Sequence, residues 1–592
     1  MRGADTIQNR REFLLGGACA LSASAGCLNR LRRTRDRDEP SPVSVQISTL
    51  PNDEDLYGIR IANHLAENLR QAGISVDVVP RRYETFLRRV LINQDYDIYV
   101  WRLENQSDPD FLRALLHSRF AEEAGWQNPF GHTDESVDEL LEAQVSQTGE
   151  ERLRTFRDIQ EQIHSTRPLI PIAFEEDRRL SRGDRITVSE QAHVRSAPWL
   201  LSLTSADDAE NGVEECELGT TDWRMTQNLN PLAVEYRGGN GLIELLYQPL
   251  MYDWGGSLIP WLATDIEWES DDVNLGDVLI VNLRDDLVWH DSEPLTATDV
   301  VFTYDFMTDT TMDDEDPTIP TPRYRGRTSL VESVARVSQN QVRFTFDGIK
   351  KSLAEQSLTV PILPRHEWEE YTSLTDIAGV TIADSTTTAL VRDNLEPIGS
   401  GPFEVTDVST DDDLELSKFD DHFLWNGDGH ALQIDQEFLD FESIRIDIRP
   451  SVTNIASSIN DQGLDGAFRS LGASVEVERD ETKETVEQTS TLYHIGFNLR
   501  KYPLMSQPFR RTIAQFIDRQ YIYDEVFGNT GVPVLSPVYD TAFVPTSLRW
   551  DPDSRDDFVG EPGDGKVDEE VAKDMLREAG FQYSADGELL GR

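Results

Sequence analysis

The hydrophobic positions near the start of the chain alternate between two spacings. Residues 43–49, 74–79 and 95–101 carry apolar side chains at every second position, as half-buried strands do. Between these segments, residues 61–73 and 86–91 carry apolar side chains at helical spacing. The pattern strand, helix, strand, helix, strand predicts half of an open α/β sheet domain.

The pattern then changes twice along the chain. Two further amphipathic helices are predicted from about Val137 and from about Glu151, followed by a strand at residues 169–174. Residues 186–222 are polar and irregular and are interpreted as a connector. Beyond them, alternating segments predict a β-rich region, and helical spacing returns from Pro508 to the end.

Charge and composition indicate a folded protein adapted to salt. The 592 residues include 108 Asp and Glu against 55 Lys and Arg, which gives a net charge of −53. A disordered acidic chain is disfavoured because 38% of the residues are hydrophobic and 11 Trp and 24 Phe are available for cores. This composition is typical of extreme halophiles, where concentrated salt screens the repulsion between charges. The chain has no basic face after residue 40, so nucleic acid is not an expected partner.

The N-terminal segment predicts export and anchoring. Paired Arg10 and Arg11 precede an apolar stretch that is too short to span a bilayer, and the segment resembles a twin-arginine signal over residues 1–27. Small residues lead to Cys27 as in a lipobox, so Cys27 is the predicted lipidation site. Residues 28–42 then read as a charged tether. The alternative is a buried N-terminal helix.

No motif indicates catalysis, a cofactor or a metal site. The chain contains no HExxH, no GxSxG and no Walker loop, and its ten His have no metal-ligand spacing. Lone Cys216 is interpreted as incidental and not catalytic, and the pair His290 and Asp291 as a structural turn and not a base with its orienter. The acidic segment 551–570 is interpreted as a solvated loop, since Arg555 and Asp556 stand where a calcium loop needs a ligand and a Gly. We therefore expect no catalytic residues, no cofactor and no metal.

Four stretches after residue 240 are GLIELLYQPLMYDW, LRDDLVWHDSEPLTATDVVF, EPIGSGPFEV and LYHIGFNLRKYPLMSQPFRRTIAQFIDR. In this order they resemble the signature segments of the peptide-type (family 5) extracellular solute-binding proteins, which serve ABC importers. Ser292 replaces the Gly that usually follows the family's HD pair, which removes a residue suited to positive φ.

The order of segments within this resemblance is unusual. In the family, the C-terminal helix here would be followed by the strands and helices that this chain carries at residues 43–174. We interpret the chain as a circular permutant, with residues 44–49 expected beside residues 585–591. Two alternatives are fusion to a fragment of another binding protein and truncation of the C-terminus. Either would leave sheet edges unpaired.

The resemblance implies a two-lobed α/β fold of the periplasmic type II class with an extra β-rich subdomain. A hinge is expected near residues 166–169 and 498–502, where the chain would cross between the lobes. The implied parts are lobe two at 43–165 and 499–592, lobe one at 166–245 (with the connector 186–222) and 395–498, and the subdomain at 246–394.

The resemblance also implies a ligand anchor. Peptide-binding relatives hold the peptide ammonium group with an Asp three residues after a Trp. In this chain Trp101 and Glu104 occupy these positions, so they are the candidate ligand-binding residues. Glu104 keeps the carboxylate that would hold a cationic group of the ligand. Its side chain is one methylene longer than that of Asp, so specificity for peptides is left open.

The expected function is capture of a small solute, most readily a peptide, for delivery to ABC permease subunits. The expected protein is a lipid-anchored monomer on the extracellular face of the cell membrane. A membrane-anchored hydrolase is one alternative, and it would need a catalytic cluster in the cleft. A sensory receptor without transport is another, and neighbouring permease and ATPase genes would argue against it.

Overall fold

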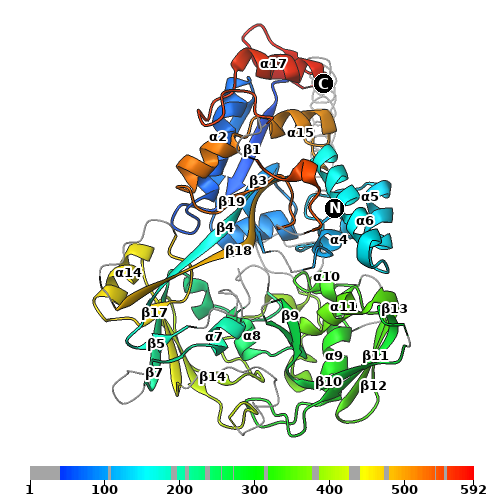
Figure 1. Cartoon of the computed structure of the whole chain (residues 1–592), viewed down its shortest axis with the longest axis vertical. Helices are drawn as coiled ribbons and strands as arrows, with labels where there is room; N and C mark the ends of the chain where they lie inside the picture. The colour runs from blue at the N-terminus through cyan, green and yellow to red at the C-terminus, as the bar shows by residue number, and fades with distance from the viewer. Residues whose placement is uncertain are drawn as a thin grey trace, which may run out of the picture.

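The chain folds into two lobes that are joined by two long strands (Figure 1). The computed structural model describes residues 41–591 except 105–107, 189–196, 207–212, 234–240, 255, 271, 313–317, 376–385, 426–440, 473–478, 480, 540–541 and 552–556. Upper and lower lobe denote here the two parts as they lie in Figure 1. Arg10, Arg11, Cys27 and most of the predicted tether lie outside the described residues.

The upper lobe is built on the end of a large mixed sheet. Strand β1 pairs in parallel with both β2 and β3, while β18 pairs antiparallel with β3 and with β4. The short strand β19 adds to the other side of β4. The bounds are β1 Ser44–Thr49, β2 Ser75–Pro80, β3 Ile98–Glu104, β4 Leu169–Arg182, β18 Thr482–Phe497 and β19 Val532–Pro533.

Side chains of β3 alternate between two cores, as the pleat of a strand requires. Ile98 and Val100 enter the core that contains α2, α15 and α17, whereas Tyr99 and Trp101 enter the core that contains α3, α4, α5 and α6. Helices therefore cover both faces of this part of the sheet. Their bounds are α2 Gly58–Gln71, α3 Tyr83–Leu87, α4 Phe111–Leu116, α5 Glu135–Ala143, α6 Gly149–Thr166, α15 Gln507–Ala514 and α17 Glu569–Glu578.

The first strand and the last residues of the chain lie together, as expected. The Val43 N–H donates to the Leu589 carbonyl at 2.7 Å, and the Leu589 N–H donates to the Gly73 carbonyl at 2.8 Å. The C-terminal hairpin consists of β20 Gln582–Tyr583 and β21 Leu589–Leu590. Val45, Ile513 and Leu589 share one core, so residues 43–49 belong to the same lobe as the helices after Pro508.

The lower lobe continues the same sheet in the order β14, β15, β16, β7, β17. Strand β7 corrects part of the interpretation of residues 186–222 as an irregular connector, because it pairs in parallel with β16 and buries Cys216. The buried helix α7 lies in the same interval. In β7, Glu215 and Glu217 interrupt the apolar pattern, whereas α7 is a short apolar helix inside a polar segment. Bounds are α7 Ala197–Leu201, β7 Glu215–Thr220, β14 Phe403–Ser409, β15 Asp413–Lys418, β16 Ser443–Ile448, α14 Val452–Asn460 and β17 Gly466–Ala467.

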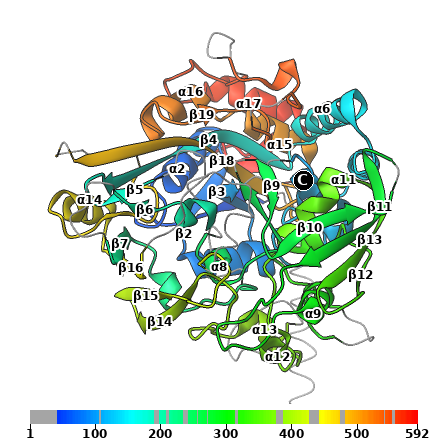
Figure 2. The same cartoon turned by 60° about the horizontal axis from the view of Figure 1, so that its bottom comes forward.

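The β-rich region forms a separate antiparallel sheet in the order β10, β11, β13, β12 (Figure 2). Its side chains share one continuous core with the rest of the lower lobe. Ser292 has φ +69°, so the Ser does adopt the left-handed conformation that favours Gly. Thr296 and Asp299 then form a capping box at the start of α9. Bounds are β10 Ala263–Trp268, β11 Leu275–Leu283, α9 Ala297–Thr308, β12 Ser333–Arg336 and β13 Gln341–Lys350.

The chain passes between the lobes in the middle of β4 and β18. Residues 169–174 pair with 492–496 in the upper lobe, and residues 176–182 pair with 482–488 in the lower lobe. The ladder is irregular between Gln488 and Leu492. The crossing therefore lies further into both strands than the hinge expected at residues 166–169 and 498–502, because the two strands stay paired through the junction.

Candidate functional site

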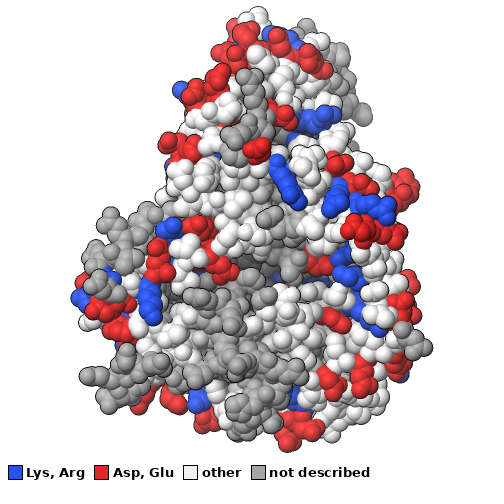
Figure 3. All heavy atoms as spheres, viewed as in Figure 1, with Lys and Arg blue, Asp and Glu red and all other residues white. Residues whose placement is uncertain are grey.

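A cavity of about 580 Å³ lies between the two lobes. The upper lobe contributes the β1–α2 loop at residues 52–57, Tyr83 and the end of β3. The lower lobe contributes the turn after β7 at residues 221–225 and the loop after β17 at residues 468–472. Figure 3 shows a recess between the lobes, while carboxylates spread over their outer faces. An enclosed space with walls from two lobes is the usual form of a small-molecule site.

Aromatic side chains form the upper wall. The ring of Trp101 stacks on Trp126 with centroids 4.7 Å apart and planes at 28°. Tyr83 meets Trp101 edge to face at 5.9 Å. Trp101 is 3% exposed and still lines the cavity, so it belongs both to the upper core and to the wall. This wall offers flat apolar surface to a ligand.

Charged side chains form part of the lower wall. The carboxylate of Asp222 accepts from Arg224 and also pairs with Arg469 at 2.7 Å. Burial alone would raise the pKa of Asp222, but the two guanidinium groups outweigh it and hold that pKa well below its ordinary value. Asp222 therefore stays ionised and fixes both arginines in place.

The back of the cavity is a rigid set of buried polar pairs. Asp177 is fully buried and accepts from Arg179 at 3.0 Å, and that guanidinium lies 4.2 Å from the ring centroid of Trp199. Asp55 accepts from the Tyr493 hydroxyl at 2.8 Å and from the backbone N–H of Gly58 at 3.0 Å. These groups are held by one another, so the wall is ordered before any ligand arrives.

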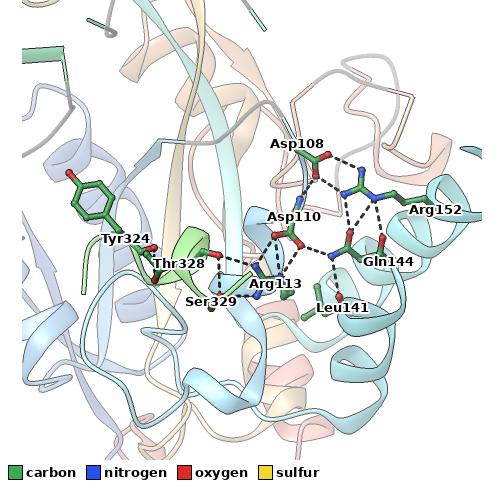
Figure 4. A network of polar contacts seen from close by, with 10 residues as sticks. Asp108, Asp110, Arg113, Leu141, Gln144, Arg152, Tyr324, Thr328 and Ser329 are labelled. Atoms are coloured by element: carbon green, nitrogen blue, oxygen red, sulfur yellow. Dashed lines mark hydrogen bonds and ion pairs between the residues drawn. The ribbon is translucent and has the colours of Figure 1, made fainter. Parts of the chain in front are cut away.

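Contacts across the lobes close the cavity on the side of α4 and α10 (Arg325–Thr328). Arg113 of the upper lobe is held by Asp110 at 3.0 Å. Its other nitrogens donate to the Gly326 carbonyl at 2.9 Å and the Ser329 hydroxyl at 3.1 Å in the lower lobe (Figure 4). The arrangement described is therefore closed on this side.

A second set of contacts supports the same closure. Asp108 accepts two hydrogen bonds from Arg152, at 2.7 and 2.8 Å (Figure 4). It also lies 3.9 Å from Lys350 of the lower lobe. Burial alone would raise the pKa of Asp108, but Arg152 outweighs it and lowers the pKa. Glu123 of the upper lobe also pairs with Arg325 at 3.0 Å.

The structure gives different information on the two predicted ligand-binding residues. Trp101 lines the cavity. Glu104 is the last residue of β3 and lies opposite Thr491, but its side chain falls outside the described residues. Sequence reasoning missed Arg102, Arg224 and the other charged wall residues, because they are contributed by segments far apart in the chain and match no motif.

Two features of the described residues bear on other functions. No group of three or more His, Cys, Asp or Glu is arranged to hold a metal ion in the part of the chain that the structure describes. None of the described helices combines the length and apolar character needed to cross a membrane. His290 is held by the backbone of Gly399 and Gly401, at 3.2 and 3.0 Å, and is therefore a structural side chain as expected.

Comparison with known families gives one match over more than half of the chain. Residues 257–590 match the model described as bacterial extracellular solute-binding proteins, family 5 middle. The match includes the β-rich sheet, α9, β18 and α17.

Individual relatives are distant. A protein of Brucella melitensis, named as a binding protein, is 25% identical over 334 residues, which are 50% of this chain and 48% of the relative. A protein of Agrobacterium fabrum, named as the peptide-binding protein YejA, is 23% identical over 60% of this chain and 59% of its own length. The chain spans about half the length of the curated relatives it matches first. The mannohexaose-bound oligopeptide-binding protein of Thermotoga maritima is 22% identical over 64% of each chain, with a TM-score of 0.42.

Proposed function

Because the chain belongs to the bacterial extracellular solute-binding proteins of family 5, we propose that it is the substrate-binding protein of an ABC transporter. It captures a small solute, with a peptide as the first candidate, and delivers it to permease subunits in the membrane. The observation that carries this proposal is the cavity of about 580 Å³ with walls from both lobes.

The mechanism follows from the two strands that join the lobes. A ligand that touches both walls stabilises the closed arrangement more than the open one, and this difference shifts the population toward closure. The ribbon of β4 and β18 would bend at its irregular region between Gln488 and Leu492. Only the closed form would dock productively on the permease.

Trp101 and Glu104 are proposed as ligand contacts. Trp101 supports this role by lining the cavity beside Trp126. Glu104 would meet a cationic group of the ligand from the end of the same strand. A Glu104→Gln variant that binds the ligand with unchanged affinity would remove the anchor role for this residue.

The order of segments is proposed to be circularly permuted. Support comes from the hydrogen bonds that join Val43, Gly73 and Leu589, and from the single core shared by residues 43–100 and 504–589. In this proposal residues 43–165 and 499–592 form lobe two. The paired segments 169–174 and 492–496 lie in the upper lobe and are added to lobe two. Lobe one takes the rest of 166–245 and 395–498, and the subdomain takes 246–394. The junction of the family's usual ends would lie within residues 186–214, before β7.

The location is proposed to be the extracellular face of the membrane. The paired Arg10 and Arg11 and the small residues before Cys27 support export and a lipid anchor. The net charge of −53 supports a surface that works in concentrated salt. The protein would act as a monomer on a tether.

Capture of solute by the purified protein tests the function. The protein is refolded in concentrated KCl, mixed with a tryptic digest of casein, washed, and denatured to release bound solutes for mass spectrometry. The proposal predicts a selected subset of peptides on the wild type and loss of that subset in Trp101→Ala. Trp550→Ala, a half-buried Trp outside the cavity lining, is the matched control and should retain it. Release of nothing beyond the wash background contradicts capture.

A further inference from the structure

Arg102 occupies an unusual position in the cavity wall. It follows Trp101 near the end of β3, and its side chain is 22% exposed and faces the cavity. Its nearest carboxylate, that of Glu175, lies 3.9 Å away, which is beyond hydrogen-bond distance. Among the residues that the structure describes, its guanidinium makes no hydrogen bond, although this group has five N–H donors.

Two other buried arginines of this protein, Arg113 and Arg510, each make several hydrogen bonds. Arg113 donates to Asp110, Gly326 and Ser329, and Arg510 donates to the carbonyls of Leu504, Thr166 and Arg167. Leaving a largely buried cationic donor without hydrogen bonds is costly, so such a group is normally satisfied by a partner or by a ligand. Arg102 differs from these two arginines in this respect.

The charge of Arg102 is maintained. Burial opposes the charge, but Tyr493, Glu175, Asp55 and Tyr83 together outweigh burial and raise the pKa of Arg102 well above its ordinary value. The group is therefore a permanent cation at the edge of the aromatic wall, and it makes no hydrogen bond to another residue that the structure describes.

Two more guanidinium groups lie close to it. Arg224 and Arg469 share the carboxylate of Asp222. Burial lowers the pKa of Arg469, the Asp222 carboxylate opposes this shift, and the positive charges of Arg224 and Arg102 add to it, so that the pKa lies below its ordinary value. This gathering of cations would be relieved by an anion placed between the lobes.

We propose that the ligand carries a carboxylate and that Arg102 binds it. This inference rests on the proposed capture function. A planar guanidinium matches a carboxylate through two parallel N–H···O bonds, and Glu175 at 3.9 Å leaves those donors available. The stacked Trp101 and Trp126 beside it would cover a flat or apolar part of the ligand. The ligand class is a carboxylate with an adjoining apolar group, either a peptide with a free carboxylate or an aryl acid.

Blocking the carboxylates of the probe tests the inference. One arm offers the casein digest untreated and after methyl esterification, and the other offers 3-phenylpropionate and its amide. The readout is the ratio of acid to blocked probe captured by the wild type, Arg102→Gln, Arg102→Lys and the control Arg343→Gln. Arg343 is an exposed residue that pairs with Glu269 far from the cavity lining.

The wild type and Arg343→Gln should favour an acid over its blocked form by about tenfold or more, since hydrogen bonds to charged groups are worth about 1.5–3 kcal/mol. Arg102→Gln should lose that preference, and Arg102→Lys should keep part of it. Because the readout is a ratio within one sample, a partly unfolded variant still reports it.

The possible results distinguish failure of the Arg102 proposal from failure of the proposed capture function. Equal capture of acid and blocked probe by the wild type, or an unchanged preference in Arg102→Gln, overturns the role of Arg102 while solute capture stands. Capture of neither form in either arm contradicts the proposed function itself.

Discussion

The guanidinium carbon of Arg224 lies 3.5 Å from the centroid of the Tyr83 ring, and this contact joins the two lobes. Tyr83 begins α3 in the upper lobe, whereas Arg224 belongs to the turn after β7 in the lower lobe. A buried cation over an aromatic ring contributes about 0.5–2 kcal/mol. Since it exists when the lobes are together, this contact favours the closed arrangement.

Replacing Tyr83 by Leu should therefore shift the ligand-free protein toward an open form. We expect a loss of about 0.5–2 kcal/mol in the free energy of closure, seen as a larger radius of gyration in small-angle X-ray scattering. Tyr371→Leu is the matched control, because Arg392 lies 3.8 Å from the Tyr371 ring and both residues belong to the lower lobe. Equal scattering of the two variants would show that the Tyr83 contact does not control closure.

The ion pair between Glu123 and Arg325 should also favour closure of the two lobes. Its two hydrogen bonds, at 3.0 and 3.2 Å, cross between the lobes, and each side chain is about one quarter exposed. Glu123→Gln should weaken closure by about 0.2–1 kcal/mol, with the larger effect at low salt, because salt screens a pair of this exposure.

The exposed pair of Glu269 and Arg343 serves as the control for this prediction. It has a similar separation, 2.9 Å, but lies within the lower lobe. Glu269→Gln should leave the scattering curve unchanged. If both variants open the protein to the same degree, the effect comes from net charge and not from the bridge between the lobes.

Acid should destabilise the fold through buried histidines. The Nε2 atom of His64 accepts from the backbone N–H of Asp518 at 3.0 Å, and burial lowers the pKa of His64 to about 4. Above about pH 6.5 the imidazole is neutral in both the folded and the unfolded chain. Below that pH the unfolded chain binds a proton that the folded chain refuses, so stability falls as pH falls from 6.5 toward 4.

The expected slope is about 1.4 kcal/mol per pH unit for each such group. Burial also lowers the pKa of His290 and His494 to about 4, so the total slope should exceed that of one group. His64→Gln should reduce this slope by the contribution of one group in chemical unfolding measured at constant salt. An unchanged slope in His64→Gln would refute the assignment.

The contact between the turn after α2 and the C-terminal hairpin predicts that an Ala at position 73 destabilises the fold. Gly73 has φ +84°, and a Cβ there would lie 2.4 Å from the Gly587 carbonyl oxygen. An Ala in the left-handed conformation alone lowers the free energy of unfolding by about 1–2 kcal/mol. Gly73→Ala should lower it by more than this, because the C-terminal hairpin must also move away.

Gly587→Ala is the control that measures the destabilisation caused by the left-handed backbone alone. Its φ is +83°, and a Cβ added there would meet nothing within 4 Å. Thermal unfolding should show a larger loss for Gly73→Ala than for Gly587→Ala. Equal losses would mean that the hairpin is not held against the strand that starts at Ser44, and would weaken the support for permutation.

Local patterns predicted the elements of the upper lobe but not the site. Apolar spacing was sufficient for β1, α2 and β2, and the turn at Ser292 was recognisable because one residue replaced a Gly. Strand β7 was missed because ECELGT carries charged residues on its less buried positions and lies in a polar segment. Its neighbours in the sheet come from much later in the chain.

The charged walls could not be predicted for a related reason. Tyr83 and Arg224, or Arg102 and Glu175, belong to segments whose proximity is set by the mixed sheet and by the closure of the lobes. Neither their spacing nor their local sequence signals the contact. The point where the chain crosses between the lobes also differs from the expected residues, because β4 and β18 stay paired through the junction.

The central claim is that the two lobes close over a bound solute. Spin labels at Glu67 on α2 and Ser457 on α14, both exposed and in different lobes, report the distance between the lobes by electron–electron double resonance. Cys216 is buried in the core and should label poorly.

The measurement is made on protein stripped of solute and again after loading with the casein digest. Closure predicts a broad or double distance distribution for the stripped protein that narrows to its shorter component on loading. Arg102→Gln should need more digest for the same change. A distribution that is identical with and without the digest, under conditions where mass spectrometry detects bound peptide, would contradict the account.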